Sequence, residues 1–533
     1  MKKTMKRHSF KSGLLSLMAL CSMALTIGSC ANDDVAQNPQ MPNDDKNLTT
    51  FAAGTPTTRT SMESDGKFFW EAGDKIYVKD DNNTWHASSN SPTGKTDNFK
   101  FKVPGTYTAH TSYEVYYPGK NGNQDQVTIS ANQTQTEPNT TAHFGTSGDC
   151  GIAKATRNAT SHEFEFALDH KAAYLVFKPY TSNDVLKYCY LTKIEVTSDN
   201  DIASTSTYTL DPTADTGAGA LTGTGNGKQI VLETKGSGAY TNGFPLTNTS
   251  ASLTTNGAYM VIKPGTHTLR IRYWVKDVAT HVEGTITKII PSHTFAKNEY
   301  VNMEADLQIK NYDGDHYYMW DAQAQYWKGH EWNLGGSQPT LTTQSASSDY
   351  PQNSSDPNNR WYNTSYPGSG ISNPATHASC KDLPNANELS WYCKFGDPRW
   401  DADELWTTMG HLYKGGMWFK KKSVLLAEHH YDTEKSADGT TDMRTTYKHY
   451  ENNHSSINSG LPSAADANKY FYLPALGYYA FGQLSYVGDN GYYWSSSADL
   501  RYSNYAYILH FYSGNVEVRS YYRNFGIRVG GFE

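Results

Sequence analysis

Short segments that alternate hydrophobic and polar residues, separated by Gly, Pro, Asn and Asp, fill the chain from about residue 48 to residue 310. Alternation with a period of two predicts half-buried β-strands, and no helical periodicity appears in this region. One set of predicted strands covers 67–70, 75–79, 99–103, 114–117, 127–129 and 172–177, and a second covers 191–196, 206–210, 229–232, 258–262, 268–275 and 284–290. Two successive sets predict two β-sandwiches rather than one large sheet.

The pattern changes after Tyr312, where the chain becomes dense in Trp and Tyr and mixes strand-like and helix-like segments. Asn385 can cap a helix whose apolar face is formed by Leu389 and Tyr392. The segment 401–419 predicts a further short helix that is followed by a Gly-Gly turn. The predicted fold class is therefore mainly β, with two β-sandwich domains followed by an α+β domain.

Strand alternation near the C-terminus accounts for part of the aromatic content there. In 506–512, Tyr507, Leu509 and Phe511 fall on one face of a predicted strand. The next three residues, 513–515, predict a three-residue turn into a returning strand. Much of this aromatic content is thus expected to be cross-strand packing, which contributes roughly 0.2–1 kcal/mol per pair.

The N-terminal segment predicts export. A basic start is followed by an apolar run from Leu14 to Ile27, which is shorter than the roughly 20 apolar residues that span a bilayer. The run predicts a signal peptide over 1–29, and the alternative is a short buried helix. Residues 30–50 are polar and contain Pro, which predicts a flexible tether.

Composition narrows the range of partners. The formal net charge of −7 argues against a nucleic-acid partner, which requires a basic face. Abundant Tyr, Thr, Ser, Asn and Gly are typical of secreted β-proteins, whose solvated strand faces carry hydroxyls and amides. The cysteines after Cys30 are too few for a disulfide scaffold and match no zinc motif. Cys380 and Cys393 are either a disulfide, in an oxidising exterior, or two free thiols.

The sequence Ile27-Gly28-Ser29-Cys30 resembles the lipobox of bacterial lipoproteins, with Ile27 where Leu is commoner. The resemblance implies cleavage before Cys30 and a diacylglycerol on its thiol. The acids that follow, Asp33 and Asp34, are similar to the signal that exports Bacteroidota lipoproteins to the cell exterior. Acyl chains hold a protein on a membrane without spanning it.

Three segments in order along the chain resemble Bacteroidales fimbrillins: "TRTSMESDGKFFWEAGDKIYV" (58–78), "LTKIEVTSDNDIAS" (191–204) and "FAKNEYVNMEADL" (295–307). With the lipobox, the resemblance covers residues 1 to about 310. It implies two transthyretin-like β-sandwich domains, an N-terminal one over 51–185 and a second over 186–310.

The same resemblance implies assembly by strand addition. Fimbrillin precursors are trimmed by a trypsin-like protease after an Arg or Lys, and the removed strand leaves a groove that another subunit's strand fills. Such a groove combines unpaired backbone groups with an apolar floor. Arg59 is the candidate processing position, and the alternative is an exposed Arg on a first strand.

The C-terminal region carries a second resemblance. The segments "LPALGYY" (473–479), "GYYWSSS" (491–497) and "FGIRV" (525–529) resemble the Fibrobacter succinogenes major paralogous domain. That domain is similar to the C-type-lectin-like fold, so the resemblance implies an α+β lectin-like domain over 311–533. In lectin-like folds, the ligand site is carried by long loops on the side of the domain where residues 498–505 are expected to lie.

One loop in this domain is a candidate for binding. Residues 498–505 lack alternation and mix Asp, Arg, Asn and Tyr, and Tyr offers large contact area at small entropic cost. The ligand-binding candidates are Asp499, Arg501, Tyr502, Asn504 and Tyr505 in the loop, with Tyr478 and Tyr479 nearby. The alternative is a solvated loop without a ligand.

No chemistry beyond binding is predicted. The domain lacks the Glu-Pro-Asn, Gln-Pro-Asp and Trp-Asn-Asp triplets of calcium-dependent lectins, so direct contact with protein or glycan is expected. No catalytic constellation is recognisable, and we expect neither enzyme activity, nor a cofactor, nor a metal.

The combined prediction is a surface-exposed lipoprotein of the outer membrane, or of a fimbrium, that acts as a fimbrial tip or accessory subunit. Because the folded C-terminal domain leaves no obvious strand to donate, a shaft role is not expected. The expected partners are other fimbrillin subunits, a host or bacterial surface protein or glycan, and the membrane through a lipid anchor only. The alternative is a non-polymerising outer-membrane lipoprotein that binds glycan or protein.

Overall fold

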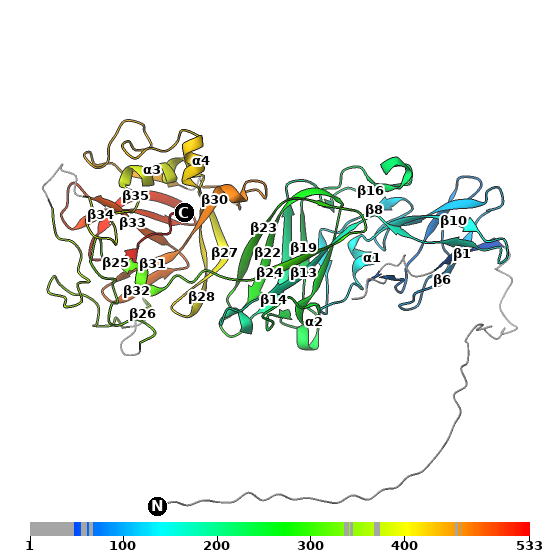
Figure 1. Cartoon of the computed structure of the whole chain (residues 1–533), viewed down its shortest axis with the longest axis horizontal. Coiled ribbons are helices and arrows are strands. Elements are labelled where there is room, and N and C mark those ends of the chain that lie inside the picture. Colours follow the sequence, from blue (N-terminus) through cyan, green and yellow to red (C-terminus); the bar gives the residue numbers. More distant parts are fainter. Residues whose placement is uncertain are drawn as a thin grey trace, which may run out of the picture. The chain divides into compact units, whose positions relative to one another are not determined.

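Strands form most of the regular structure, as the alternating pattern predicts (Figure 1). The computed structural model describes residues 47–54, 61–62, 68–334, 340–341, 345–366, 374–453, 457–458 and 460–533. The predicted signal peptide, Cys30 and Arg59 lie outside these residues. Within them, no helix is long and apolar enough to cross a membrane.

The first set of strands forms one eight-stranded sheet around a core of its own. Its order is β5 (Trp85–Ala87), β4 (Tyr77–Lys79), β7 (Ser112–Tyr117), β10 (Gly151–Arg157), β11 (Phe164–Phe166), β1 (Leu48–Ala53) and β6 (Phe99–Pro104), with β12 (Asp169–His170) on β10. A separate two-stranded ladder joins β2 (Ser61–Met62) and β3 (Phe68–Phe69).

The sequence also predicts a hairpin of 67–70 with 75–79, but β4 pairs with β5 and β7 instead. Trp70 is fully buried, with its ring against Phe101 and Tyr117. Its backbone pairs with that of Thr96 in an isolated β-bridge. Trp70 thus contributes its ring to the core of the first sheet and does not pair with the strand that follows it.

The second set forms two sheets whose residues meet in one core. The larger sheet runs β9 (Asn132–Thr134), β19 (Gln229–Glu233), β14 (Tyr190–Ser198), β22 (Gly265–Lys276) and β23 (Glu283–Phe295), with β20 (Phe244–Pro245) on β14, and continues into the C-terminal region. The smaller sheet runs β21 (Ala258–Ile262), β13 (Ala173–Tyr180) and β24 (Tyr300–Asp306).

Short elements complete this region. They are β8 (Gln126–Val127) with β16 (Tyr208–Asp211) and β17 (Ala220–Thr222), β15 (Ala203–Ser204) with β18 (Asn226–Gly227), the helices α1 (Phe144–Ser147) and α2 (Leu253–Asn256), and the 3₁₀ turns η2 (Leu186–Tyr188), η3 (Asp215–Gly217) and η4 (Gly238–Tyr240).

Three strands from the range predicted for the first sandwich pair with strands of the second set. β8 pairs with β16, β9 pairs with β19, and β13 pairs with β21 and β24. The apolar run 172–177 is buried as predicted, since Ala173, Leu175 and Phe177 on one face of β13 and Tyr174 and Val176 on the other are all buried. The run does not alternate because both faces of this strand are covered.

The C-terminal region is a nine-stranded sheet with one helix against it. The order is β26 (Thr340–Leu341), β32 (Gln483–Val487), β31 (Leu476–Ala480), β33 (Gly491–Ala498), β34 (Tyr505–Tyr512), β35 (Asn515–Tyr522) and β29 (Tyr450–Asn453), and β36 (Ile527–Arg528) joins β33 to β25 (Tyr317–Tyr318). α3 (Ala386–Phe395) contacts β33, β34 and β35 (Figure 1). α4 (Lys422–Ala427), η5 (Gly314–His316) and η6 (Ala467–Lys469) lie in the connections.

The predicted cap of α3 is confirmed. The Asn385 side chain accepts from the Glu388 backbone N–H, and the Glu388 side chain accepts from the Asn385 N–H, so the two form a capping box. Leu389 and Tyr392 are both buried. The helix therefore begins where its local sequence dictates.

The predicted helix within 401–419 is wrong. The segment is an antiparallel hairpin of β27 (Arg399–Thr408) and β28 (His411–Lys420), with β30 (Tyr470–Pro474) beside it. Met409 and Gly410 form the turn with φ of 49° and 74°, as a tight hairpin requires. Leu405 belongs to the core of the second set and Trp406 to the C-terminal core. A strand with an apolar residue on each face lacks the alternation that would have revealed it.

The hairpin of β34 and β35 is tighter than predicted. Tyr512 pairs with Asn515, so only Ser513 and Gly514 form the turn. The predicted faces are confirmed, since Tyr507, Leu509 and Phe511 all lie in the main C-terminal core.

The cysteines that the structure describes are free and buried. The Cys380 thiol accepts from the Asp321 N–H at 3.2 Å, and the Cys393 thiol donates to the Val516 carbonyl at 3.3 Å. Burial raises the pKa of both thiols to about 12. The two thiols do not form the disulfide that the sequence left open.

A buried polar network joins β22 and β23 of the second set to the C-terminal hairpin. β27 pairs in parallel with β23, where Thr285 is opposite Glu404. The Arg272 guanidinium donates to Asp401 at 2.8 Å and to the Thr285 hydroxyl at 2.6 Å. The Glu404 carboxylate accepts from the Thr287 hydroxyl at 2.6 Å. The pairing of β23 with β27 and the ion pair of Arg272 with Asp401 thus join the second set of strands to the C-terminal hairpin at neighbouring positions.

The Glu404 carboxyl makes this junction sensitive to pH. Burial, and secondarily the charge of Asp401, raise the pKa of Glu404 to about 7. A raised carboxyl pKa means that the folded chain binds more protons than the unfolded chain between about pH 4.5 and 7, so this group's contribution to stability falls as the pH rises through that window. We expect Glu404→Gln to flatten that part of the stability profile. Denaturant midpoints at intervals from pH 4.5 to 8 measure it, and parallel profiles for the variant and the natural chain would contradict it.

Candidate binding surface of the C-terminal domain

The loop between β33 and β34 is built around Asp499. This side chain is 1% exposed and accepts from the backbone N–H groups of Arg501 (2.6 Å) and Tyr502 (3.1 Å). Such side-chain-to-backbone bonds close a turn locally. Asp499 therefore shapes the loop, and it is not exposed to a ligand.

Arg523 holds the loop through hydrogen bonds from its buried side chain. Its side chain is fully buried and donates to the carbonyls of Tyr505 (2.9 Å) and Asn363 (2.9 Å), while its guanidinium lies over the Trp320 ring. Burial lowers the pKa of Arg523 to about 10, so the group remains cationic at neutral pH. Its backbone N–H also donates to the Asn504 carbonyl at 2.8 Å. Sequence reasoning missed this anchor, which no local pattern indicates.

The remaining loop candidates face solvent. Arg501, Tyr502 and Asn504 are exposed, and Tyr505 is half-buried. The Arg501 guanidinium lies over the ring of Tyr447, which comes from a distant part of the chain. A loop held by Asp499 and Arg523 thus presents these side chains in a defined arrangement.

Tyr478 and Tyr479 lie on opposite faces of β31, as adjacent strand residues do. Tyr478 stacks with Tyr486 and contacts Tyr492 and Tyr521. Tyr479 is fully buried, and its hydroxyl donates to the Met409 sulfur at 3.2 Å. Only Tyr478 shares a surface with the loop.

Tyr478 and the loop residues Tyr502 and Tyr505 belong to a continuous set of ring contacts that extends well beyond the loop. Ring contacts link Tyr502 to Tyr505, Tyr505 to Tyr522, Tyr522 to Phe525 and Phe525 to Tyr478. The further members are Phe481, Tyr486, Tyr492, His510, Tyr512 and Tyr521. We call this set the aromatic surface.

The strand register places Tyr492, His510, Tyr512 and Tyr521 on the face opposite the one that α3 covers, and it places Tyr505 and Tyr522 on the same face as Tyr507 and Leu509. The aromatic surface therefore includes rings from both faces, which meet near the end of β34 and β35. Sequence reasoning treated much of the aromatic content of this region as packing between strands, which agrees with these ring contacts. It missed that Phe481, Tyr486 and Tyr522 are 61%, 52% and 42% exposed. Alternation predicts which residues share a face, but it does not predict whether another element covers that face.

A charged group lies at one end of the aromatic surface. Glu517 is largely buried, which opposes its ionisation, but a hydrogen bond from His510 at 2.7 Å and the charge of Arg519 hold the pKa of Glu517 at about 2. Arg519 also lies over the Tyr521 ring. The surface therefore combines exposed rings with a fixed ion pair, which suits recognition of another molecule.

Among the residues that the structure describes, no cluster of three His, Cys, Asp or Glu could hold a metal ion.

Comparison with known proteins gives a family match for the C-terminal part of the chain. A model of a domain of unknown function (DUF8237) matches residues 448–532, which include the strands from β29 to β36. No curated protein matches the chain.

Among solved structures, the chain is similar to a "putative cell adhesion protein" from Bacteroides uniformis, with 15% identity over 50% of this chain and 94% of that one, and a TM-score of 0.28. A "putative cell adhesion protein" from Bacteroides ovatus shows 13% identity over 49% of this chain and 93% of that one, and a TM-score of 0.28. The fimbrial anchor protein Mfa2 from Porphyromonas gingivalis shows 10% identity over 45% and 82%, and a TM-score of 0.22.

Proposed function

We propose that this chain is made as a surface lipoprotein, anchored through Cys30 until the segment that carries β1 is removed, and that it acts as a fimbrial tip or accessory subunit. A neighbouring subunit's strand replaces β1, and the aromatic surface of the C-terminal domain contacts the target. The chain acts by presenting surfaces rather than by catalysis.

The position of β1 carries the proposal. β1 pairs with β6 on one side, antiparallel, and with β11 on the other, in parallel. Phe51 is fully buried, with its ring 5.1 Å from Phe164 and 5.2 Å from Tyr107. Loss of β1 would leave two strands with unpaired backbone groups beside an apolar groove, which is what an added strand requires.

The candidate processing site suits this role. Arg59 follows the last residue of β1, Ala53, by six positions in the sequence. Cleavage after Arg59 therefore separates β1 from every other strand of the sheet while leaving β6 and β11 in one chain.

The proposal is tested by limited digestion of the full chain with trypsin, followed by addition of a labelled peptide with the sequence of residues 47–54. We expect the digested chain to bind the peptide, because the peptide restores the lost ladder and refills the site of Phe51. The matched control is Arg59→Gln, which should bind little peptide under the same digestion. A digested, folded chain that loses β1 and binds no peptide would refute strand addition.

One observation favours the alternative of a non-polymerising outer-membrane lipoprotein. In the uncleaved chain, β1 already completes its sheet, so the chain needs no partner strand to be folded. Addition of a purified shaft fimbrillin to the digested chain separates the two functions. Peptide binding without incorporation of the fimbrillin strand would favour the alternative.

A further inference from the structure

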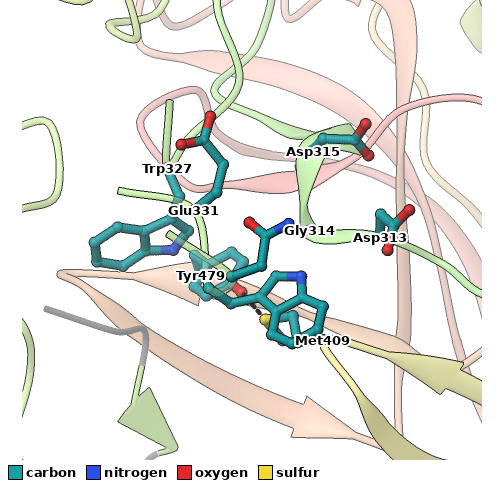
Figure 2. A pocket seen from close by; sticks show the side chains of 9 residues that line it. Asp313, Gly314, Asp315, Trp327, Glu331, Met409 and Tyr479 are labelled. Atoms are coloured by element: carbon teal, nitrogen blue, oxygen red, sulfur yellow. Dashed lines mark hydrogen bonds between the residues drawn. The ribbon is translucent and has the colours of Figure 1, made fainter. Parts of the chain in front are cut away.

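A pocket opens on the other face of β31 from the aromatic surface. It has a volume of about 320 Å³ and is lined by Asp313, Gly314, Asp315, Trp327, Glu331, Trp332, Asn333, Met409 and Tyr479. Figure 2 shows η5 on one side, Trp327 and Glu331 on the other, and Tyr479 with Met409 between them. The volume is at the lower end of the roughly 300–1,000 Å³ of small-molecule sites.

Aromatic rings form the floor and one wall. Tyr479 and Trp327 are both buried, with ring centroids 5.9 Å apart. Trp332 is 38% exposed and stands against the turn of β27 and β28, where a Cβ on Gly410 would lie 3.1 Å from its ring. The pocket thus has rigid inner rings and one open indole face on which a flat apolar surface can stack.

The charge of the lining is negative. Asp313, Asp315 and Glu331 contribute carboxylates, and none of the nine lining residues, all of which the structure describes, is a Lys or Arg. Glu331 is held in place by hydrogen bonds from the Gln325 amide and the Gly329 N–H, each 3.0 Å. The neighbouring His316 pairs with Asp315. A carboxylate that is already oriented can accept from a ligand at little further entropic cost.

The two buried rings of the lining leave hydrogen bonding with a ligand to other groups. Trp327 is 3% exposed, and its Nε1 is covered by the surrounding side chains. Tyr479 is fully buried, and its hydroxyl donates to the Met409 sulfur. The polar contacts of a ligand therefore fall to the carboxylates of the lining.

We propose that this pocket binds one uncharged sugar ring of a glycan. The apolar face of the ring stacks on Trp332, and its hydroxyls donate to the rim carboxylates. The inference rests on the adhesive part of the proposed function and is independent of strand addition.

Two other ligand classes fit less well. An alkylammonium group, such as a lysine side chain, would pair with the carboxylates and the rings, but Glu331 already accepts two hydrogen bonds, Asp315 pairs with His316, and an ammonium offers no flat face to Trp332. A sialylated or sulfated sugar carries a negative charge that the carboxylates repel. A neutral sugar supplies hydroxyl donors and a flat apolar face together.

The test is titration of the full chain with the methyl glycosides of galactose, glucose, mannose and N-acetylglucosamine, followed by tryptophan fluorescence and ligand-observed NMR. The same titrations with N-acetylneuraminic acid and n-butylammonium distinguish the classes. We expect at least one neutral glycoside to bind and the charged probes not to bind. Binding of n-butylammonium alone, or of no neutral glycoside, would overturn the inference.

Variants locate the site. Trp332→Ala should weaken binding by about tenfold or more, as loss of a central aromatic contact does, and Trp332→Phe should restore part of it because a stacking face returns. Glu331→Gln should also weaken binding, since an amide is a poorer acceptor than a carboxylate. Tyr188→Ala, at a tyrosine that is 71% exposed and belongs neither to this pocket nor to the aromatic surface, is the matched control and should leave sugar binding unchanged.

Unchanged binding in both Trp332→Ala and Glu331→Gln would overturn the site. Unfolding midpoints of the variants guard against a folding defect. Peptide binding after digestion at Arg59 should be the same in Trp332→Ala as in the natural chain. The inference about the pocket and the proposal of strand addition can therefore fail separately.

Discussion

Replacement of Arg272 by alanine is expected to lower the free energy of unfolding by roughly 3–5 kcal/mol. Arg272 is 6% exposed and Asp401 is 3% exposed, and the two are joined at 2.8 Å. Removal of the guanidinium leaves a buried carboxylate without its cation and also deprives the Thr285 hydroxyl of two donated hydrogen bonds. Differential scanning calorimetry of the full chain measures the effect.

The Arg272→Ala substitution should also change how the two regions unfold. Because Leu405 and Leu412 of the C-terminal hairpin pack into the core of the second set, the two regions should unfold together in the natural chain and separately in the variant. Arg157→Ala, at an exposed arginine, is the matched control and should change stability by less than about 0.5 kcal/mol. In the double variant Arg272→Ala with Asp401→Asn, we expect a smaller loss than the sum of the single losses. A full sum would show that the pair does not couple the regions.

Replacement of Phe51 by alanine is expected to cost about 3–5 kcal/mol, which is typical of a buried Phe reduced to Ala. Phe51 is fully buried, and its ring contacts the ring of Phe164 on β11 and the ring of Tyr107 in the segment that follows β6. A cavity there weakens β1 more than any other strand. Chemical denaturation of the first sheet, followed by its tryptophan fluorescence, measures the loss.

The same substitution should ease the release of β1. After digestion at Arg59, the Phe51→Ala chain should lose its N-terminal fragment faster than the natural chain, since less apolar area holds the strand. Phe481→Ala deletes the same side chain at a position that is 61% exposed, and it should change neither stability nor release. Equal release rates for Phe51→Ala and the natural chain would show that Phe51 does not retain β1.

Local patterns were reliable where a segment has one buried face. The strands predicted at 191–196 and 229–232 lie within β14 and β19, in which buried residues alternate with more exposed ones. The capping box of α3 needs only residues three positions apart, so it can be predicted without the fold. In each case, interactions close in sequence decide the structure.

Patterns failed where both faces of a segment are covered. β27 places Leu405 in one core and Trp406 in another, and its turn depends on positive φ at Met409. Nothing local distinguishes such a segment from a short helix. Asp499 is a similar case, because its polarity suggested a contact with a ligand, whereas its carboxylate is used by the backbone of its own loop.

The sequence by itself determined that this is a mainly β protein, which residues of each strand share a face, and that an unusual number of tyrosines would line the C-terminal sheet. These properties follow from the period of two, which is a property of neighbouring residues. Only the tertiary structure decided which faces stay uncovered, that Tyr478 and Tyr479 serve two different surfaces, and that Arg272 meets Asp401. These depend on pairings between segments far apart in the chain, whose free energy comes from burial and charge that no short segment contains.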